Sequence, residues 1–457
     1  MSDKTSVQDG LPVPGRYWAI LAIALGITVS VLDGAIANVA LPTIAGDLHT
    51  SPTLSIWVVN AYQLAITISL LSLSSIGEIW GYRKVYTYGL LLFSCTSLAC
   101  ALADSLVTLI IARTLQGFGA AAITSVNTAL IRIIYPKRFL ARGMGLNALV
   151  VSVSAAAGPT IAAGILSVAN WPWLFAVNIP VGLTALLLSY KFLPPNPVVV
   201  KGRRFDVPGG LLNAVTFGLL IAIIEGFTHD VNIFIILAGV LIAAFSGYVY
   251  IRREMKEDYP LFPVDLLKIP VFSLSILTSV FSFIAQMLAM VSLPFFLQRV
   301  LGKDEVATGL LLTPWPLATM LFAPLAGILS DKIKAGLLGG IGMIIFAIGL
   351  FLLATMPTHL SDTEIIWRMA VCGCGFGLFQ TPNNSTIIAS APDNRGGGAS
   401  GMLGTARLMG QTIGASLVAL MFKVFPGHSM HASLLLGSVL AVVAAVISML
   451  RVSNRMK

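Results

Sequence analysis

The chain has 457 residues, of which 57% are hydrophobic and only 10% are charged, and its formal net charge at pH 7 is +9. Soluble domains carry about 25% charged residues, so a soluble protein of this length would leave too much apolar surface in water. The composition therefore excludes an ordinary soluble protein and indicates a chain that is surrounded by lipid.

Apolar runs of about 20 residues recur along the whole chain, and this is the length of a helix that crosses a bilayer. Fourteen membrane helices are predicted, and the even number places both termini on the same side. They span residues 16–39, 52–73, 85–103, 106–133, 143–168, 173–194, 207–227, 232–251, 271–296, 306–329, 337–356, 364–388, 399–423 and 431–450.

The 28 Lys and Arg residues are distributed unevenly between the predicted loops. Most lie on the same side as the N-terminus; the exceptions are Arg299, Lys303, Arg368 and Lys423 on the opposite side and Arg113 and Arg407 inside helices. Because cytoplasmic loops carry an excess of basic residues, both termini are predicted to be cytoplasmic. This placement explains the positive charge without a nucleic-acid partner. The polar start Met1–Gly15 leads directly into a helix long enough to span, so no cleavable signal peptide is predicted.

Histidines and cysteines indicate neither a metal site nor a disulfide framework. The four cysteines lie in predicted helices and are expected to be small buried residues. No nucleophile–base constellation is present in the sequence, so the chain is not expected to be an enzyme or to hold a cofactor. The histidines fall in or beside loops opposite the N-terminus, where they cannot relay protons inside the membrane: His49, His229, His359, His428 and His431.

Two long polar connections divide the chain. They lie at about 195–206 and 252–270 and bracket the seventh and eighth helices, which predicts two six-helix bundles with a helix pair between them. The predicted parts are a cytoplasmic tail 1–15, a bundle 16–194, a linker with the inserted helices 195–270, a bundle 271–450 and a cytoplasmic tail 451–457.

Four segments carry distinctive motifs: VLDGAIANVALPTI at 31–44, SSIGEIWGYRK at 74–84, RTLQGFG at 113–119 and SAAAGPTIAA at 154–163. With them, over essentially its whole length, the chain resembles the major facilitator superfamily in its fourteen-helix drug:proton antiporter branch. Segments 171–182 and 205–209 are typical of that branch. The resemblance implies an all-α membrane protein with the major facilitator fold, fourteen transmembrane helices in a 6+2+6 arrangement and a place in the bacterial inner membrane.

The segment 74–84 is similar to the family motif that latches the two bundles in one state. The latch residues are then Glu78, Gly81, Arg83 and Lys84, with Asp331 in a second copy at 327–336. Glu78 replaces the usual Asp, Ser74 replaces the first Gly, and Lys334 stands where the second copy has Gly. A carboxylate at this place favours the N-terminal end of a neighbouring helix. A solvated turn between helices is the alternative explanation.

Gly158 and Pro159 correspond to the antiporter motif of the fifth helix. Three glycines of that motif are Ser or Ala in this chain, but small residues still allow close helix approach. Pro159 removes a backbone donor and permits a bend. An ordinary close-packed, bent helix explains the segment equally well.

Charges inside lipid are costly, so each one is a functional hypothesis. Asp33 and Arg113 are predicted at similar depths, and we expect them to form the proton-coupling pair, in which Asp33 holds Arg113 when ionised and releases it when protonated. A permanent structural ion pair is the alternative. Glu225, near the outer end of the seventh helix, is either an interfacial acid that reaches water or a group that attracts cations at the mouth of the solute cavity.

The predicted solute cavity is an apolar space with few polar groups, which suits varied amphiphiles. For any single residue predicted to line this cavity, ordinary helix packing is the alternative explanation. In addition to Glu225, the candidate residues are Asn38, Tyr62, Asn127, Phe283, Gln286, Met287, Trp315, Gln380, Asn383 and Asn384.

The resemblance implies a proton-coupled antiporter that exports lipophilic, cationic compounds. Its expected partners are the solute, protons and the bilayer, and it is expected to be a monomer. A transporter of a specific metabolite, such as an amino acid, sugar or siderophore, remains the second interpretation. A channel or receptor is the third; the repeated motif argues against a simple pore, and the lack of a sizeable soluble domain argues against a receptor.

Overall fold

The computed structural model describes residues 10–136, 139–195, 205–228, 231–257, 260–330, 332–357, 361–392 and 396–454. Within these ranges all regular structure is helical. His229, Asp331, His359 and Arg395 lie outside the described residues, as does most of the connection 195–206. The elements are α1 (Gly15–Asp47), α2 (Pro52–Ser55), α3 (Trp57–Trp80), α4 (Tyr82–Ala101), α5 (Leu106–Ile134), α6 (Leu140–Leu166), α7 (Pro172–Ala176), α8 (Asn178–Phe192), α9 (Val207–Thr228), α10 (Ile233–Glu254), the 3-10 helix η2 (Val264–Lys268), α11 (Pro270–Phe295), the π-helix η3 (Phe296–Val300), α12 (Glu305–Leu312), α13 (Pro314–Ser330), α14 (Ala335–Ala354), α15 (Asp362–Ser390), α16 (Gly396–Val424) and α17 (Ser429–Asn454).

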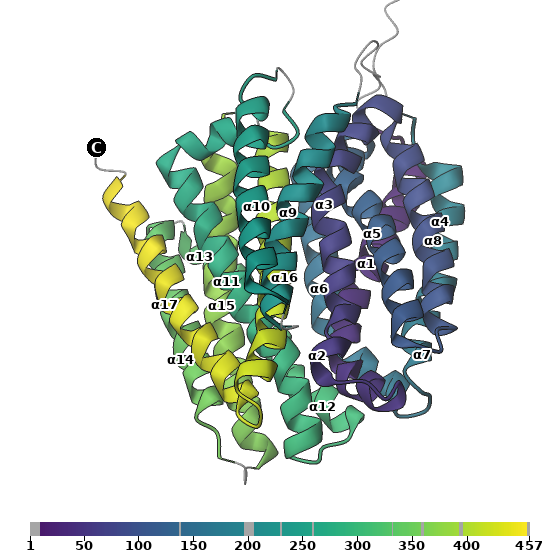
Figure 1. Ribbon diagram of the computed structural model, residues 1–457. Coiled ribbons are helices and arrows are strands. Elements are labelled where there is room, and N and C mark those ends of the chain that lie inside the picture. Colours follow the sequence, from purple (N-terminus) through teal and green to yellow (C-terminus); the bar gives the residue numbers. More distant parts are fainter. Residues whose placement is uncertain are drawn as a thin grey trace, which may run out of the picture.

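Two groups of helices lie side by side, with a helix pair along the boundary between them (Figure 1). The N-terminal group consists of α1, α3, α4, α5, α6 and α8, and the C-terminal group of α11, α13, α14, α15, α16 and α17. In the pair α9–α10, α9 packs on α3 of one group and on α16 of the other. The short helices α2, α7 and α12 lie at the lower end in Figure 1, which we call the α12 end.

Eleven segments of the described chain are long and apolar enough to cross a membrane, judged by length and composition. Most of the predicted spans correspond to one of them. The helices α4, α15 and α16 correspond to the predicted spans 85–103, 364–388 and 399–423 but carry more polar residues and are not among the eleven.

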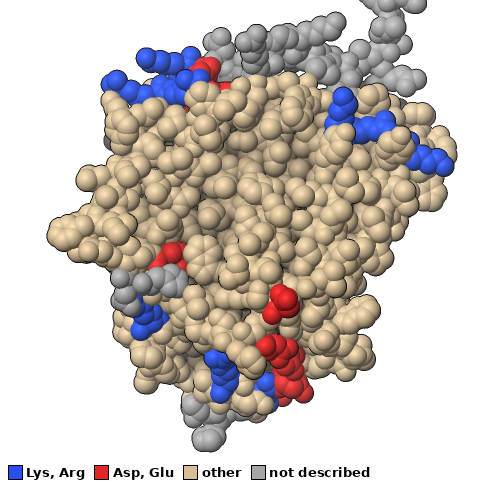
Figure 2. Space-filling model, turned by 45° about the vertical axis from the view of Figure 1, so that its right-hand side comes forward, with Lys and Arg blue, Asp and Glu red and all other residues tan. Residues whose placement is uncertain are grey.

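The surface between the two ends is apolar. Figure 2 shows most of the charged side chains of one face near its upper and lower parts, with an uncharged band between them. Large apolar side chains such as Phe234 and Leu241 of α10 are exposed in this region, as expected where helices face lipid. Cys95 is also exposed, against the prediction, whereas Cys100 and Cys372 are buried as predicted.

Two helix ends differ from the sequence prediction. The first helix does not stop at residue 39 but continues through the buried Pro42 to Asp47, so that Asp33 lies near the middle of α1. The last helix continues to Asn454, and the predicted tail 451–457 therefore begins inside α17. Helix starts follow side-chain caps: Ser105 and Thr108 form a capping box at the start of α5.

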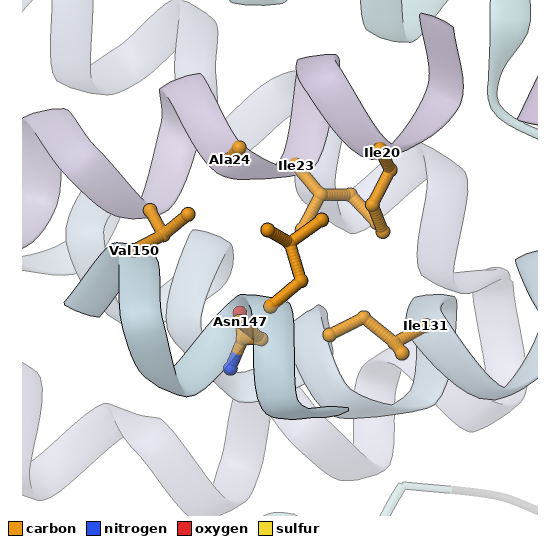
Figure 3. Close-up of a pocket in the computed structure, with 7 residues that line it drawn as sticks. Ile20, Ile23, Ala24, Ile131, Asn147 and Val150 are labelled. Atoms are coloured by element: carbon orange, nitrogen blue, oxygen red, sulfur yellow. The ribbon is translucent and has the colours of Figure 1, made fainter. Parts of the chain in front are cut away.

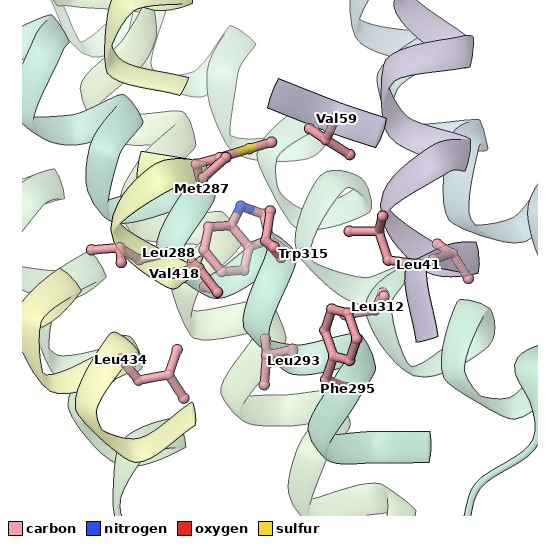
Figure 4. Packing of buried hydrophobic residues seen from close by; sticks show 14 of the residues in the cluster. Leu41, Val59, Met287, Leu288, Leu293, Phe295, Leu312, Trp315, Val418 and Leu434 are labelled. Carbon is pink, nitrogen blue, oxygen red and sulfur yellow. The ribbon is translucent and has the colours of Figure 1, made fainter. Parts of the chain in front are cut away.

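The two groups share one hydrophobic core toward the α12 end. In Figure 4, Leu41 and Val59 of the N-terminal group lie opposite Met287, Phe295 and Trp315 of the C-terminal group. All five side chains are buried in a single cluster. The groups are therefore packed tightly together on this side of the molecule.

Candidate functional site

A buried carboxylate, that of Asp33 in α1, is the centre of the candidate site. Its side chain is 1% exposed and forms an ion pair with the fully buried Arg113 of α5, as the sequence analysis predicts. Asp33 Oδ1 also accepts hydrogen bonds from Gln116 Nε2 at 3.1 Å and from Asn178 Nδ2 at 2.7 Å. One carboxylate therefore joins α1 to α5 and to the first residue of α8.

The guanidinium group of Arg113 has partners on several sides. Its Nε donates to the carbonyl oxygen of Val58 in α3 at 3.0 Å, and its Nη1 donates to Gln116 Oε1 at 2.6 Å as well as to Asp33. The ring of Tyr62 lies against it, with 4.1 Å between the guanidinium carbon and the ring centroid. An aromatic face stabilises a cation electrostatically, so Arg113 keeps favourable surroundings beyond its ion pair.

Tyr62, a predicted cavity residue, contacts this ion-pair site. It is 3% exposed, and its hydroxyl donates to the carbonyl oxygen of Ser30 at 3.0 Å. Its polar atom is bonded to α1 and its ring faces Arg113, and its predicted contact with solute stays a prediction.

Two residues of the site, Gln116 and Asn178, were missed by sequence reasoning. Gln116 stands three positions after Arg113, which places both side chains on one face of α5. Asn178 stands in the segment 171–182, which is typical of the antiporter branch, but the motif alone assigns this residue no role. An amide one helical turn from an embedded arginine was therefore the available signal.

The Asp33 network can couple proton binding to helix packing. Its four side chains come from three helices and have no contact with bulk solvent. Removing one partner of a buried ion pair costs about 3–5 kcal/mol, because the other charge remains desolvated. Protonation of Asp33 removes the charge of one partner in the same way, so a proton at this oxygen alters what holds α1 against α5.

Glu225 does not reach water at the membrane surface, and that interpretation is wrong. Its side chain is 4% exposed, and its Oε1 accepts a hydrogen bond from Asn60 Nδ2 at 2.9 Å. Ser416 Oγ accepts from the same amide nitrogen at 3.1 Å and lies in α16. The carboxylate of α9 is thus tied to α3 and α16, one helix from each group.

Three predicted cavity residues of the C-terminal group are packed in its core. Phe283 lies 5.6 Å from Phe376 between ring centroids, and Trp315 lies 5.2 Å from Phe346, both with edge-to-face geometry. Met287 is 3% exposed in the same cluster (Figure 4). Trp315 Nε1 is buried and has no hydrogen-bond partner among the described residues.

Asn383 is buried in a polar junction between helices, and its predicted contact with solute stays a prediction. Its Oδ1 accepts a hydrogen bond from Arg451 Nη1 at 2.6 Å, and its Nδ2 donates to Ser279 Oγ at 2.8 Å. Arg451 Nη1 also donates to Ser275 Oγ at 2.8 Å. The junction connects α11, α15 and α17. Arg451, predicted to lie in the cytoplasmic tail, is 3% exposed.

Asn127 also forms a helix contact, because its Nδ2 donates to Asn147 Oδ1 of α6 at 2.7 Å. Asn147 lines a small hollow between α1, α5 and α6, shown in Figure 3, whose other lining residues are apolar. The remaining predicted cavity residues keep partly exposed side chains: Asn38, Gln286, Gln380 and Asn384.

The predicted latch segment forms the turn between α3 and α4. Gly81 has φ of 109°, a backbone conformation that favours glycine, and it separates the two helices. Arg83 donates to the carbonyl oxygen of Tyr190 in α8, Lys84 is exposed, and Glu78 lies in the last turns of α3. The latch role of these residues stays a prediction.

Polar contacts join the two groups at the α12 end. The hydroxyl of Thr43 in α1 lies 3.1 Å from Glu305 Oε1 and 3.4 Å from Gln298 Oε1, and Gln298 Nε2 donates to the carbonyl oxygen of Val39 at 3.1 Å. Gly158 of the predicted antiporter motif packs on Ala35 of α1 so closely that a Cβ at position 158 would overlap it. The next residue, Pro159, lies beside α12.

The model of the Major Facilitator Superfamily matches residues 23–414 and 275–456. The chain belongs to this superfamily of membrane transporters. It is 60% identical to the uncharacterized transporter YebQ of Escherichia coli (strain K12), over 98% of each chain. It is 31% identical to the riboflavin transporter RibZ of Clostridioides difficile (strain 630), over 89% of this chain and 88% of that one. It is also 31% identical to the multidrug resistance protein Stp of Mycobacterium tuberculosis (strain CDC 1551 / Oshkosh), over 87% of this chain and 74% of that one.

Solved structures support the fold. A D-xylose-proton symporter structure matches with a TM-score of 0.70 and 15% sequence identity, over 94% of this chain and 97% of that one. At this identity the likeness concerns the arrangement of helices. The all-helical major facilitator fold that the motifs predict is therefore present.

Proposed function

We propose that this protein is a proton-coupled antiporter that exports lipophilic compounds by alternating access. The carrying observation is the fully buried Asp33–Arg113 pair, a titratable site at the meeting point of three helices. Charges are retained inside a membrane bundle at such cost that proton relays and solute pathways are their usual roles. The permanent structural pair remains the competing explanation.

Helix α1 connects the proton site to the contact between the two groups. Asp33 and Thr43 lie in the same helix, ten residues and about 15 Å apart along its axis. Thr43 and the carbonyl of Val39 bond to Glu305 and Gln298 at the α12 end. A proton at Asp33 alters the packing of α1 on α5, and the same helix carries this change to the contact that holds the groups together.

The topology in this proposal follows the charge distribution of the sequence. Fourteen helices cross the bacterial inner membrane in a 6+2+6 order, with both termini cytoplasmic, and the protein acts as a monomer. The parts are the bundle 16–194, the linker and inserted pair 195–270 and the bundle 271–450. In this orientation the α12 end faces outward, and the structure is closed on the outer side.

The relatives support two solute classes. A relative named for multidrug resistance favours export of varied compounds. A relative named as a riboflavin transporter favours the second candidate, transport of one specific metabolite. Both candidates use the same proton site, so they differ only in the solute.

The test uses the purified protein in proteoliposomes with an imposed pH gradient, with ethidium and riboflavin as probes. The wild type is compared with Asp33→Asn and with Asp47→Asn, which changes an exposed acid at the end of the same helix. We expect the pH gradient to drive uptake or release in the wild type and in Asp47→Asn. Asp33→Asn should lose this dependence while remaining folded. Transport by Asp33→Asn at the wild-type rate under the same gradient would refute the proton role of Asp33.

A further inference from the structure

Arg407 stands out among the embedded arginines because it has neither an ion pair nor a hydrogen bond with any described residue. It lies near the middle of α16, and its side chain is partly exposed. Its Nε is buried without a hydrogen-bond partner, and no described carboxylate forms an ion pair with it. By contrast, Arg113 is paired with Asp33, and Arg451 is bonded to Asn383.

The helical period of α16 places Arg407 between two packing surfaces. Leu408 belongs to the N-terminal core, and Thr412 Oγ1 lies 3.4 Å from Thr67 Oγ1 of α3. Gly410 and Gly414 face the other way and pack on α11. At 100° per residue, position 407 falls about 20° from Gly414 and about 100° from Leu408, so it lies at the edge of the surface of α16 that packs on α11. The same helix α16 packs on α11 of its own group and on α3 of the other group.

Two other groups extend the polar character of this region. Tyr62, which covers Arg113, lies in α3, the helix that α16 contacts through Thr67 and Thr412. Trp315 Nε1 is a second buried donor without a partner among the described residues. In Figure 4 its nitrogen lies on the side of Met287, and Met287 is the side chain that borders Gly414 of α16. Both are donors, and neither supplies a negative charge for the partly buried guanidinium group of Arg407.

We propose that Arg407 binds an acidic group of the transported solute, so that the preferred solutes are amphiphilic organic acids. A guanidinium group recognises a carboxylate or phosphate through paired hydrogen bonds. The buried side chains of α16 near it, such as Leu408 and Ala415, are apolar, which favours an amphiphilic molecule. This inference rests on the proposed transport function and changes its expected solute from a cation to an anion. Because α16 packs on α3, and Tyr62 of α3 covers Arg113, the same helix contacts both the solute site and the proton site.

Binding of two matched probes tests the inference directly. The compounds 9-anthracenecarboxylate and 9-(aminomethyl)anthracene share one fluorescent ring system and carry opposite charges at neutral pH. Their affinities are measured for the purified protein in lipid nanodiscs, with empty nanodiscs as the blank. We expect the wild type to bind the carboxylate at least about tenfold more tightly than the amine, a difference of ~1.4 kcal/mol. Equal affinity, or a preference for the amine, would overturn the inference.

Variants identify the residue responsible. Arg407→Gln should abolish the preference for the carboxylate, and Arg407→Lys should retain part of it because the charge remains. Arg252→Gln is the matched control, since Arg252 is an exposed cation at the end of α10. An unchanged preference in Arg407→Gln would assign the anion to another site and refute the role of Arg407. If Arg407→Gln does not fold, the wild-type preference for the carboxylate and its partial retention in Arg407→Lys still test whether Arg407 binds the anion.

Two further arms separate the possible sources of the anion. Repeating the measurement with phosphatidylglycerol in the nanodiscs shows whether a lipid phosphate occupies the site, since the carboxylate affinity then falls. Such competition would overturn the assignment to a solute. The proteoliposome experiment on Asp33 is independent: proton-driven transport without an anion preference rejects this inference alone, and an anion preference without proton-driven transport rejects the proposed function alone.

Discussion

Separating the two members of the Asp33–Arg113 pair shows whether they act as one unit. Arg113→Met leaves a buried carboxylate with two amide donors and no cation, which costs about 3–5 kcal/mol for the broken pair. The same change also removes the hydrogen bonds to the Val58 carbonyl and to Gln116, and each orphaned group adds about 1–3 kcal/mol. We therefore expect Arg113→Met to be more destabilising than Asp33→Asn.

The double variant, Asp33→Asn with Arg113→Met, removes both charges. An amide at position 33 still accepts hydrogen bonds from Gln116 and Asn178, so no desolvated charge remains in the site. We expect its destabilisation to be smaller than the sum of the two single effects, with a coupling free energy of at least about 1.5 kcal/mol.

The assay is reversible unfolding in mixed micelles, titrated with dodecyl sulfate and followed by tryptophan fluorescence. The unfolding midpoints and slopes of the wild type, both single variants and the double variant give the four corners of the cycle. Additivity within about 0.5 kcal/mol would show two independent contacts and would refute the coupled pair.

Two other predictions concern contacts outside this pair. Glu305→Gln should weaken the contact with Thr43 at the α12 end by about 1 kcal/mol. The fraction of molecules that are open at this end should then rise about fivefold. The measurement is the distribution of distances between spin labels on the ends of α1 and α12. Asp206, just before α9, pairs with Arg253 at 2.8 Å. Burial raises the pKa of Asp206, but hydrogen bonds from Arg253 and a backbone N–H outweigh this and hold the pKa below its usual range. Its stabilising contribution should therefore be complete above the usual Asp pKa of about 3.9 and disappear as the pH falls through the lowered value.

Each of these predictions has its own control. The distribution of spin-label distances should be unaffected by Asp304→Glu, which retains a carboxylate cap on α12 without altering Glu305. An unchanged distribution in Glu305→Gln would contradict the role of the Thr43–Glu305 contact in holding the two groups together. For Asp206, the melting temperatures of the wild type and Asp206→Asn are compared from pH 7 to pH 3. A stability difference that stays constant over this range would contradict the role of the ionised side chain.

Hydropathy, charge placement and motifs were sufficient for the positions of the helices and for the Asp33–Arg113 pair. The pair was predictable because two embedded charges of opposite sign at similar depth have few alternative partners. The exact helix ends were not predictable from the sequence, as the C-terminal end of α1 shows. Its C-terminal part beyond residue 39 has small and apolar residues compatible with either a helix or a loop, and its packing in the shared core decides between them.

Side-chain partners across distant segments were the part that sequence could not supply. Glu225 was expected at the membrane surface because position along a helix gives depth but not the identity of its neighbours. Its burial depends on α9 lying against both α3 and α16. Asn383 was assigned to a cavity for the same reason, since its partner Arg451 stands 68 residues further along the chain.

The Asn383–Arg451 junction also provides a frame of reference for observing motion. It joins α11, α15 and α17, the first, fourth and sixth helices of the C-terminal group, as Asp33 joins α1, α5 and α8 of the N-terminal group. An amide takes up no proton where Asp33 has a carboxylate, so this junction has no reason to loosen when the pH changes. An antibody fragment or a pair of labels anchored to the C-terminal group therefore keeps its geometry, and displacements of α1 can be measured against it.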